Sequence, residues 1–211
     1  MDKELQNLYV VARRAREDFN SRLAAQYYDR ILQKQPMSWE AYFYATYFSL
    51  CSFTILEIPR TAQTMRKCLG NTFVLIRDHV EDEAEQNAAV CEAASSCQAL
   101  ASMLDGGAVL YYQHLDPGKQ QRFQDVFQMS RIEVAYFLRD LGDLVNCVFE
   151  ECMDLKGHAL EAWWTVVKRM DHLGQMIGYS KEARELISSM EQRMQSTRAA
   201  MPAFPYPAGT P

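Results

Sequence analysis

The chain has 211 residues, a formal net charge of −5 at pH 7 and a hydrophobic content of 48%. This length accommodates one ordinary domain or two small ones, and the apolar fraction is sufficient for a buried core. The negative charge is mild and spread along the chain, which argues against a broad basic surface that could neutralise phosphates. Nucleic acid is therefore not an expected partner.

Glycine and proline are scarce, with nine and seven residues, while good helix formers are abundant. We therefore predict an all-α protein. No apolar run reaches the length of about 18 residues that a membrane span needs, and the start of the chain lacks the apolar core of a signal peptide. The sequence thus predicts a cytoplasmic protein without a membrane partner, whose six cysteines act as buried apolar side chains.

The first two predicted helices form a hairpin. Apolar residues recur every three or four positions over about residues 3 to 18, as on the buried face of a helix. Asn20 or Ser21 caps a second helix. Pro36 ends this helix, because its ring disfavours a helical conformation at the preceding residue and it has no amide proton to donate.

Two more helices follow in the first half of the chain. Ser38 offers its hydroxyl as the cap of a helix over about residues 39 to 56. The next helix begins near Pro59, where proline is tolerated because a first-turn amide has no partner within the helix, and it runs to about Val80.

A fifth predicted helix is rich in small residues. It begins at Asp82-Glu83-Ala84-Glu85, which has the D-x-x-E form of a capping box. Because small side chains let a neighbouring helix approach closely, we expect this helix near the centre of the bundle. Gly106-Gly107 either kinks the helix or ends it.

A long helix follows the break at Asp116-Pro117-Gly118. Its apolar residues recur in alternating steps of three and four over residues 123 to 155, like the seam of a coiled coil. We expect an antiparallel partner within the same domain rather than a zipper between two chains. Gly157 and Gly178 end successive helices, and Ser180 caps the last one.

These elements predict a single all-α domain over residues 1–200. Residues 3–56 form the first hairpin and the first helix of the next unit, and the longer helices occupy residues 59–115 and 117–200. The proline-rich tail, residues 201–211, is expected to be disordered, with docking into another protein's groove as the alternative.

The N-terminal segment carries a family resemblance. Ala24, Tyr28, Ile31 and Pro36 have the spacing of the second-helix signature of a tetratricopeptide repeat, and Trp39-Glu40-Ala41-Tyr42-Phe43-Tyr44 looks like the opening of the next repeat. The chain therefore resembles tetratricopeptide-repeat proteins over about residues 5 to 50. The segment is also similar to uncharacterised bacterial helical-repeat proteins, some of which carry an N-terminal zinc ribbon that is absent here. The resemblance implies antiparallel helical hairpins, which we expect to continue as a bundle of longer helices.

The resemblance also implies a concave face that holds a peptide. In this register the concave-face positions are Gln6, Tyr9, Arg13, Arg16, Phe43 and Tyr47. Arginines beside aromatic rings favour a carboxylate or an extended peptide, because guanidinium groups match carboxylates and the rings supply rigid contact area. The alternative is that the aromatic residues are packed in the core and that the arginines form a solvated face.

No pattern in the sequence indicates catalysis or a cofactor. The cysteine and histidine spacings of zinc sites and the E-x-x-H pairs of di-iron bundles are absent. Phosphate-binding loops and the G-x-S-x-G elbow are also absent. No cysteine adjoins a histidine in the sequence, which leaves open the pairs that folding creates. We therefore predict no catalytic residue, no metal ligand and no cofactor.

The leading hypothesis is a non-enzymatic helical-repeat module that binds a protein or peptide partner. One alternative is a helical bundle that binds a small molecule or a metal in its core, or acts as an enzyme through residues assembled by folding. Another is a structural domain that associates with itself as a homodimer through the long helix.

Overall fold

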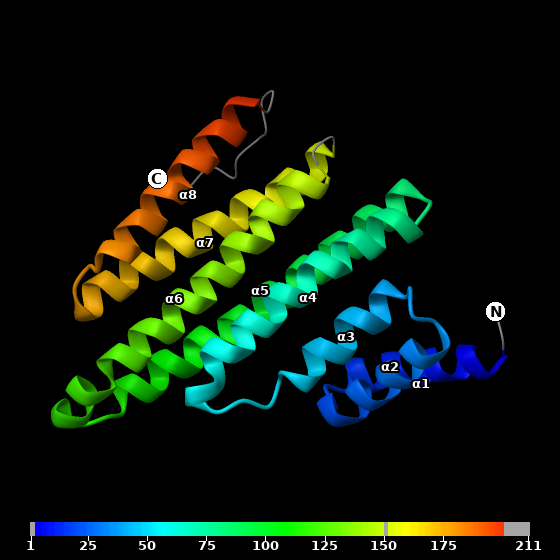
Figure 1. The fold of residues 1–211 in the computed structure, drawn as a ribbon, viewed down its shortest axis with the longest axis horizontal. Helices are drawn as coiled ribbons and strands as arrows, with labels where there is room; N and C mark the ends of the chain where they lie inside the picture. Colours follow the sequence, from blue (N-terminus) through cyan, green and yellow to red (C-terminus); the bar gives the residue numbers. More distant parts are fainter. Residues whose placement is uncertain (1–2, 150–151, 201–211) are drawn as a thin grey trace.

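The computed structural model describes residues 3–149 and 152–200 (Figure 1). Over these ranges the chain is all-α and has no β-strand, which confirms the predicted fold class. The helices are α1 (Lys3–Glu17), α2 (Ser21–Lys34), α3 (Trp39–Ser49), the short 3-10 helix η1 (Ile55–Glu57), α4 (Ile58–His79), α5 (Glu83–Gln113), α6 (Pro117–Val148), α7 (Met153–Ile177) and α8 (Lys181–Ala200). The predicted tail lies outside the described residues, and the division into domains stays a prediction.

Side-chain caps begin five of the helices at residues that the sequence predicts. In each case a side-chain oxygen accepts a hydrogen bond from the amide three residues later, which satisfies a first-turn amide that has no partner within the helix. The caps are Asn20 for α2, Ser38 for α3, Asp82 for α5, Asp116 for α6 and Ser180 for α8.

The third helix is shorter than predicted. It ends at Ser49 rather than near residue 56, and η1 begins after a short loop. The Glu57 carboxylate accepts hydrogen bonds from both the amide and the hydroxyl of Thr54, each at 2.8 Å, which fixes a new helix start there. The apolar residues across this loop have the composition of a continuing helix, so the pattern alone did not reveal the break.

The two glycines in the middle of the chain do not interrupt α5, which is helical from Glu83 to Gln113. Each glycine costs a helix about 1 kcal/mol relative to alanine. The apolar neighbours Leu104 and Ala108 are buried, and their packing holds the helix through Gly106-Gly107. The alternative that the helix ends at this point is therefore wrong, and α5 continues to Gln113.

The boundary between α6 and α7 lies earlier than predicted. α6 ends at Val148, and Gly157, which was expected to end it, lies inside α7. A methyl group at Gly157 would meet no atom within 4 Å, so no close contact requires glycine there. By contrast, Gly178 ends α7 as predicted, with a φ of +89° that favours glycine.

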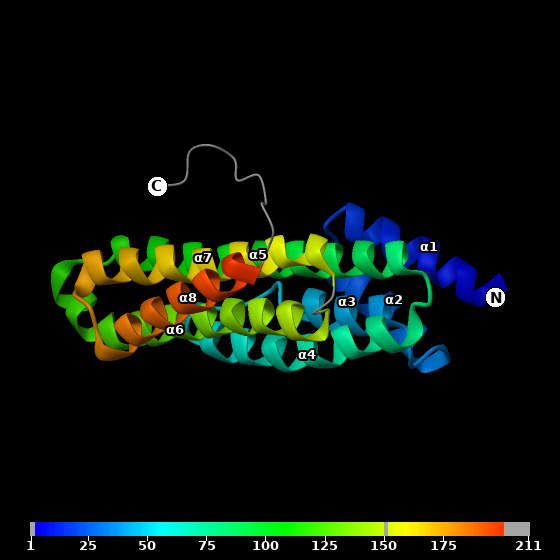
Figure 2. The ribbon, with the colours of Figure 1, turned by 90° about the horizontal axis from the view of Figure 1, so that it is seen from above.

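The long helices α4 to α8 run antiparallel in succession and form the larger part of an elongated molecule (Figure 1). Seen from above, α5 and α7 lie in one layer and α4 and α6 in the other (Figure 2). α6 packs against α4, α5 and α7, so the seam predicted on it faces helices of the same chain. In the part of the chain that the structure describes, no helix combines the length and apolarity needed to cross a membrane.

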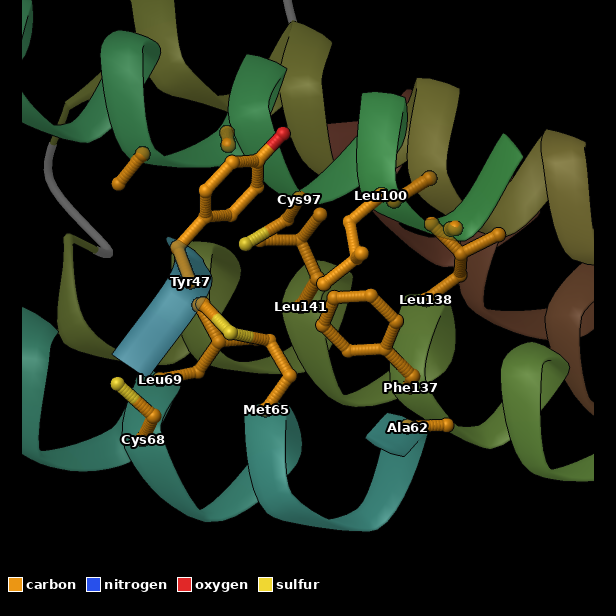
Figure 3. Close-up of a cluster of buried hydrophobic side chains, with 14 of the residues drawn as sticks. Tyr47, Ala62, Met65, Cys68, Leu69, Cys97, Leu100, Phe137, Leu138 and Leu141 are labelled. Carbon is orange, nitrogen blue, oxygen red and sulfur yellow. The ribbon is translucent and has the colours of Figure 1, made fainter. Parts of the chain in front are cut away.

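The core is continuous from the N-terminal hairpin to α8. Figure 3 shows its middle, where side chains of four helices lie together: Tyr47 of α3, Met65 of α4, Leu100 of α5 and Phe137 of α6. Met65, Leu100 and Phe137 are completely buried, and each such side chain contributes about 1.5–3 kcal/mol of burial free energy. This shared apolar interior fixes the position of α3 relative to the long helices.

The cysteines only partly follow the prediction of buried side chains. Cys68 and Cys97 are buried in the core, which fits that prediction. Cys147 is exposed, and three others, Cys51, Cys91 and Cys152, are partly exposed. The prediction was wrong for Cys147, whose side chain lines an open hollow shared by α6, α7 and α8.

Candidate functional site

Two of the six residues predicted for a peptide face belong to the core. Phe43 is completely buried and Tyr47 is 9% exposed. Their rings stack on each other with centroids 5.8 Å apart. α3 packs against α2 and α4, and its Tyr44 reaches α5, so almost its whole circumference is covered. Phe43 and Tyr47 therefore do not lie on the open face expected for them, and they act through packing.

The other four residues, Gln6, Tyr9, Arg13 and Arg16, lie on α1. Gln6 and Arg13 are exposed, whereas Tyr9 and Arg16 are partly buried. The Tyr9 hydroxyl and the Ser38 hydroxyl form a hydrogen bond of 2.6 Å. This contact ties the middle of α1 to the residue that caps α3.

Arg13 and Glu40 form the central ion pair of this region. Arg13 donates from Nε to Glu40 Oε1 at 2.9 Å and from Nη2 to Glu40 Oε2 at 2.6 Å. The buried Tyr28 hydroxyl also donates to Glu40 Oε1, at 3.0 Å. Two parallel hydrogen bonds hold a guanidinium in one orientation, so the Arg13 side chain is fixed by a carboxylate of its own chain.

Arg16 is held by a second carboxylate. It forms an ion pair with Glu92 of α5, and its guanidinium lies 4.6 Å from the centre of the Tyr44 ring. The Tyr44 hydroxyl donates to the same Glu92 carboxylate at 2.7 Å. Glu92 thus connects α1 and α3 to the long helix α5.

Burial shifts the titration of the tyrosines in this network. Burial, with the Glu40 carboxylate adding to it, raises the pKa of Tyr28, and burial also raises the pKa of Tyr44 and of Tyr9. The hydrogen bond to Glu40 raises the pKa of Arg13 above its already high usual value. At neutral pH the tyrosines are therefore uncharged donors and the arginine is a permanent cation.

Two adjoining hollows open beside this network, with volumes of about 490 and 400 Å³. Both are lined by Arg13, Trp39, Glu40 and Val80, so we treat them as one feature, the α1–α3 groove. The first hollow adds side chains from the α2–α3 turn and the α4–α5 turn, and the second adds side chains from α5. These further lining residues are Tyr9, Gln35, Met37, Ser38 and His79 in the first hollow, and Arg16, Glu85, Ala88, Ala89 and Glu92 in the second.

The groove is not a cationic site. Arg13 and Arg16 supply two positive charges, whereas the three lining glutamates supply three negative ones. The carboxylates that match the guanidinium groups come from Glu40 and Glu92 of this chain. A carboxylate ligand would have to displace them. The surface left for a partner is the exposed Met37, with Trp39 and Val80 beside it. The Tyr9 hydroxyl there already donates to Gln35 Oε1 at 3.2 Å.

A separate charged cluster lies inside the long bundle. Arg131 of α6, only 1% exposed, donates to both oxygens of Asp105 at 2.7 and 3.3 Å. Arg169 of α7 lies 3.6 Å from the same carboxylate and donates to the Ala101 carbonyl at 2.7 Å. Burial lowers the pKa of Arg169. Arg131 also donates to His172 Nδ1 at 3.4 Å, so the cluster is saturated by contacts within the chain.

Sequence reasoning missed the two carboxylates that organise the groove. Glu40 stands in the segment that resembles a repeat opening, and a carboxylate at a helix start reads as an ordinary favourable charge. Its pairing with Arg13 depends on how α1 packs beside α3. Glu92 is 76 residues from Arg16, and no sequence signal connects the two.

Comparisons with protein-family models, with curated proteins and with solved structures find no match to this chain. Within residues 3–149 and 152–200 no group of three or more histidine, cysteine, aspartate or glutamate side chains is arranged to hold a metal ion. The groove and the buried cluster are therefore interpreted from their own geometry.

Proposed function

We propose that this protein is a non-enzymatic, cytoplasmic helical module that binds an extended segment of a protein partner in the α1–α3 groove. The observation that carries the proposal is the groove itself. Its two hollows together have the volume of a ligand site, and exposed apolar side chains adjoin fixed polar groups in it. The tetratricopeptide-like order of the first hairpin supports the same proposal.

The charges of the groove favour one kind of segment. Arg13 and Arg16 are engaged by Glu40 and Glu92, and Glu85 adds a further negative charge. An acidic segment would be repelled by these carboxylates, whereas a neutral or basic one would not. An apolar side chain of the partner would pack on Met37, which is 58% exposed. We therefore propose a segment with one apolar anchor and no net negative charge.

The test uses random peptides displayed on phage and selected against the full chain. Selected peptides are synthesised, and their dissociation constants are measured with the unchanged protein and with Met37→Glu. We expect selection to enrich peptides with an apolar anchor, and we expect Met37→Glu to weaken their binding at least about tenfold, because a desolvated anchor contact is worth about 1–3 kcal/mol.

Met103→Glu is the matched control. Met103 is 46% exposed on α5, outside both hollows, so this change adds the same charge to an exposed methionine elsewhere. Binding should be unaffected by it. Selection that enriches no sequence, or peptides that bind Met37→Glu as tightly as the unchanged protein, would argue against the groove as a binding site.

The alternatives have weaker support. The polar cluster around Asp105 is the strongest candidate for a core ligand site, but its guanidinium groups already bind a carboxylate, a carbonyl and an imidazole of the chain. Self-association through the long helix has little surface available, because α6 packs against α4, α5 and α7.

A further inference from the structure

A thiol and an imidazole meet between α5 and α7. His158 Nε2 lies 3.2 Å from Cys91 Sγ, although 67 residues separate the two in the sequence. Both side chains are partly exposed, so small molecules in solution can approach them. The pair lies outside the α1–α3 groove, and the proposed binding function does not use it.

A neighbouring contact joins α5 to the residue that precedes α7. One turn before Cys91 on α5, the Asn87 Oδ1 atom accepts a hydrogen bond of 3.3 Å from Cys152 Sγ. Cys152 is the residue that precedes the first turn of α7, and His158 is in the second turn.

An imidazole nitrogen at hydrogen-bond distance can accept the proton of a thiol. The thiolate is the nucleophilic form of cysteine, and a free cysteine has a pKa of about 8.5, so few thiols are ionised at neutral pH without such a partner. We propose that Cys91 is a redox modification site, at which His158 takes the thiol proton and a hydroperoxide oxidises the sulfur to a sulfenic acid.

The step balances with these groups and the hydroperoxide alone. The thiolate attacks one peroxide oxygen, so that an S–O bond forms while the O–O bond breaks and two electrons pass from sulfur to the peroxide. The departing alkoxide or hydroxide takes the proton from the His158 imidazolium. The products are the Cys91 sulfenic acid and one molecule of alcohol or water, and His158 returns to its neutral form.

The geometry favours a hydroperoxide over a disulfide reagent for two reasons. An alkoxide or hydroxide is a poorer leaving group than a thiolate, so its departure gains more from a proton donor at the site. A partly buried sulfur is also reached more readily by a small oxidant than by a bulky disulfide.

Cys147 provides the internal comparison, because it is the exposed cysteine of α6. If exposure alone governed oxidation, Cys147 would react before Cys91. The proposal gives the opposite order, with Cys91 first. The fully buried Cys97 should react last in either case.

The reduced full chain is treated with hydrogen peroxide at pH 7 in the presence of dimedone, which traps sulfenic acids, and each cysteine is followed over time by peptide mass spectrometry. We expect trapping at Cys91 to be at least about tenfold faster than at Cys147, in line with the contribution of a positioned base. His158→Gln replaces the imidazole with an amide of similar size that cannot take up the proton. This variant should slow trapping at Cys91 at least about tenfold and leave the trapping rate at Cys147 unchanged.

The pH dependence of iodoacetamide alkylation gives a second readout. As the pH is lowered, Cys91 should still be alkylated at pH values where Cys147 no longer is. His158→Gln should remove this difference between the two cysteines. Equal trapping rates at Cys91 and Cys147 in the unchanged protein would overturn the proposal. So would an unchanged Cys91 rate in a folded His158→Gln protein. If circular dichroism shows that this variant is unfolded, His158→Asn replaces it. The ratio of the trapping rates at Cys91 and Cys147 in the unchanged protein decides between the outcomes whichever variant is used.

Discussion

The guanidinium of Arg131 and the carboxylate of Asp105 form two hydrogen bonds that join α6 to α5 inside the long bundle. The same carboxylate faces Arg169 of α7 at 3.6 Å. One aspartate thus compensates two largely buried guanidinium groups from two other helices. Removing one partner of a buried ion pair leaves the other charge without compensation. Loss of Asp105 would do so for two arginines, so this aspartate should contribute strongly to the stability of the fold.

Asp105→Asn should lower the free energy of unfolding by about 3 kcal/mol, since both guanidinium groups lose their counter-charge in a poorly solvated site. Urea denaturation followed by circular dichroism measures the change. Asp18→Asn is the control, because Asp18 pairs with Arg14 across 3.9 Å at an exposed position, and its loss should change stability by less than about 0.5 kcal/mol. Similar losses in the two variants would contradict the importance assigned to Asp105.

Gly142→Ala should destabilise the protein by about 1–3 kcal/mol through overpacking, although alanine is the better helix former. A methyl group at this position would lie 2.5 Å from Nε1 of Trp163, whose ring is almost completely buried and donates to Asp143 at 3.1 Å. The midpoint of thermal unfolding and the near-ultraviolet circular dichroism of tryptophan report the effect.

Gly70→Ala is the counterpart within α4, where a methyl group would meet no atom within 4 Å. This substitution should raise the free energy of unfolding by about 0.5–1 kcal/mol, because it gains helix propensity without a clash. The two glycine variants should therefore shift stability in opposite directions. Stabilisation by both substitutions would contradict the packing described around Trp163, and destabilisation by both would contradict the open space described at Gly70.

Tyr47 should make the protein sensitive to alkali. Burial raises the pKa of Tyr47 to about 12, whereas an unfolded tyrosine titrates near its usual value of about 10. As the pH rises, the unfolded chain loses this proton first. The contribution of Tyr47 to the free energy of unfolding is therefore complete below a pH of about 10. It declines as the pH rises toward 12.

Tyr47→Phe tests this dependence, because phenylalanine keeps the packing and cannot ionise. Unfolding free energies measured in urea from pH 9 upward should fall less steeply with pH in this variant than in the unchanged protein. Parallel dependences would show that Tyr47 ionises as easily in the folded protein as in the unfolded chain.

The sequence predicted most of what depends on near neighbours along the chain. The caps at Asn20, Ser38 and Ser180 were found because a cap bonds an amide three residues away. The end of α7 at Gly178 follows from its positive φ. At Gly157 and Gly106-Gly107 the local signal was misleading, since burial of the flanking apolar residues outweighs the cost of a glycine inside a helix.

The site was less predictable because it depends on which helices become neighbours. Tyr9 and Arg13 were expected on an accessible part of α1, and both line the α1–α3 groove. Phe43 and Tyr47 were assigned to the same face, but α3 is covered on nearly all sides by other helices. The pairing of Cys91 with His158 depends on the packing of α5 against α7, on which the sequence carries no signal.

The order in which the helices pack bears on how the chain reaches its native state. Every extensive contact joins two helices that follow each other in the chain, such as α1 and α2, or two that are separated by a single helix, such as α4 and α6. Few long loops must therefore close before apolar surface is buried. Proteins with such local contacts fold rapidly. The bond from Arg16 to Glu92 is an exception that spans 76 residues, and it should form late, after α5 has docked.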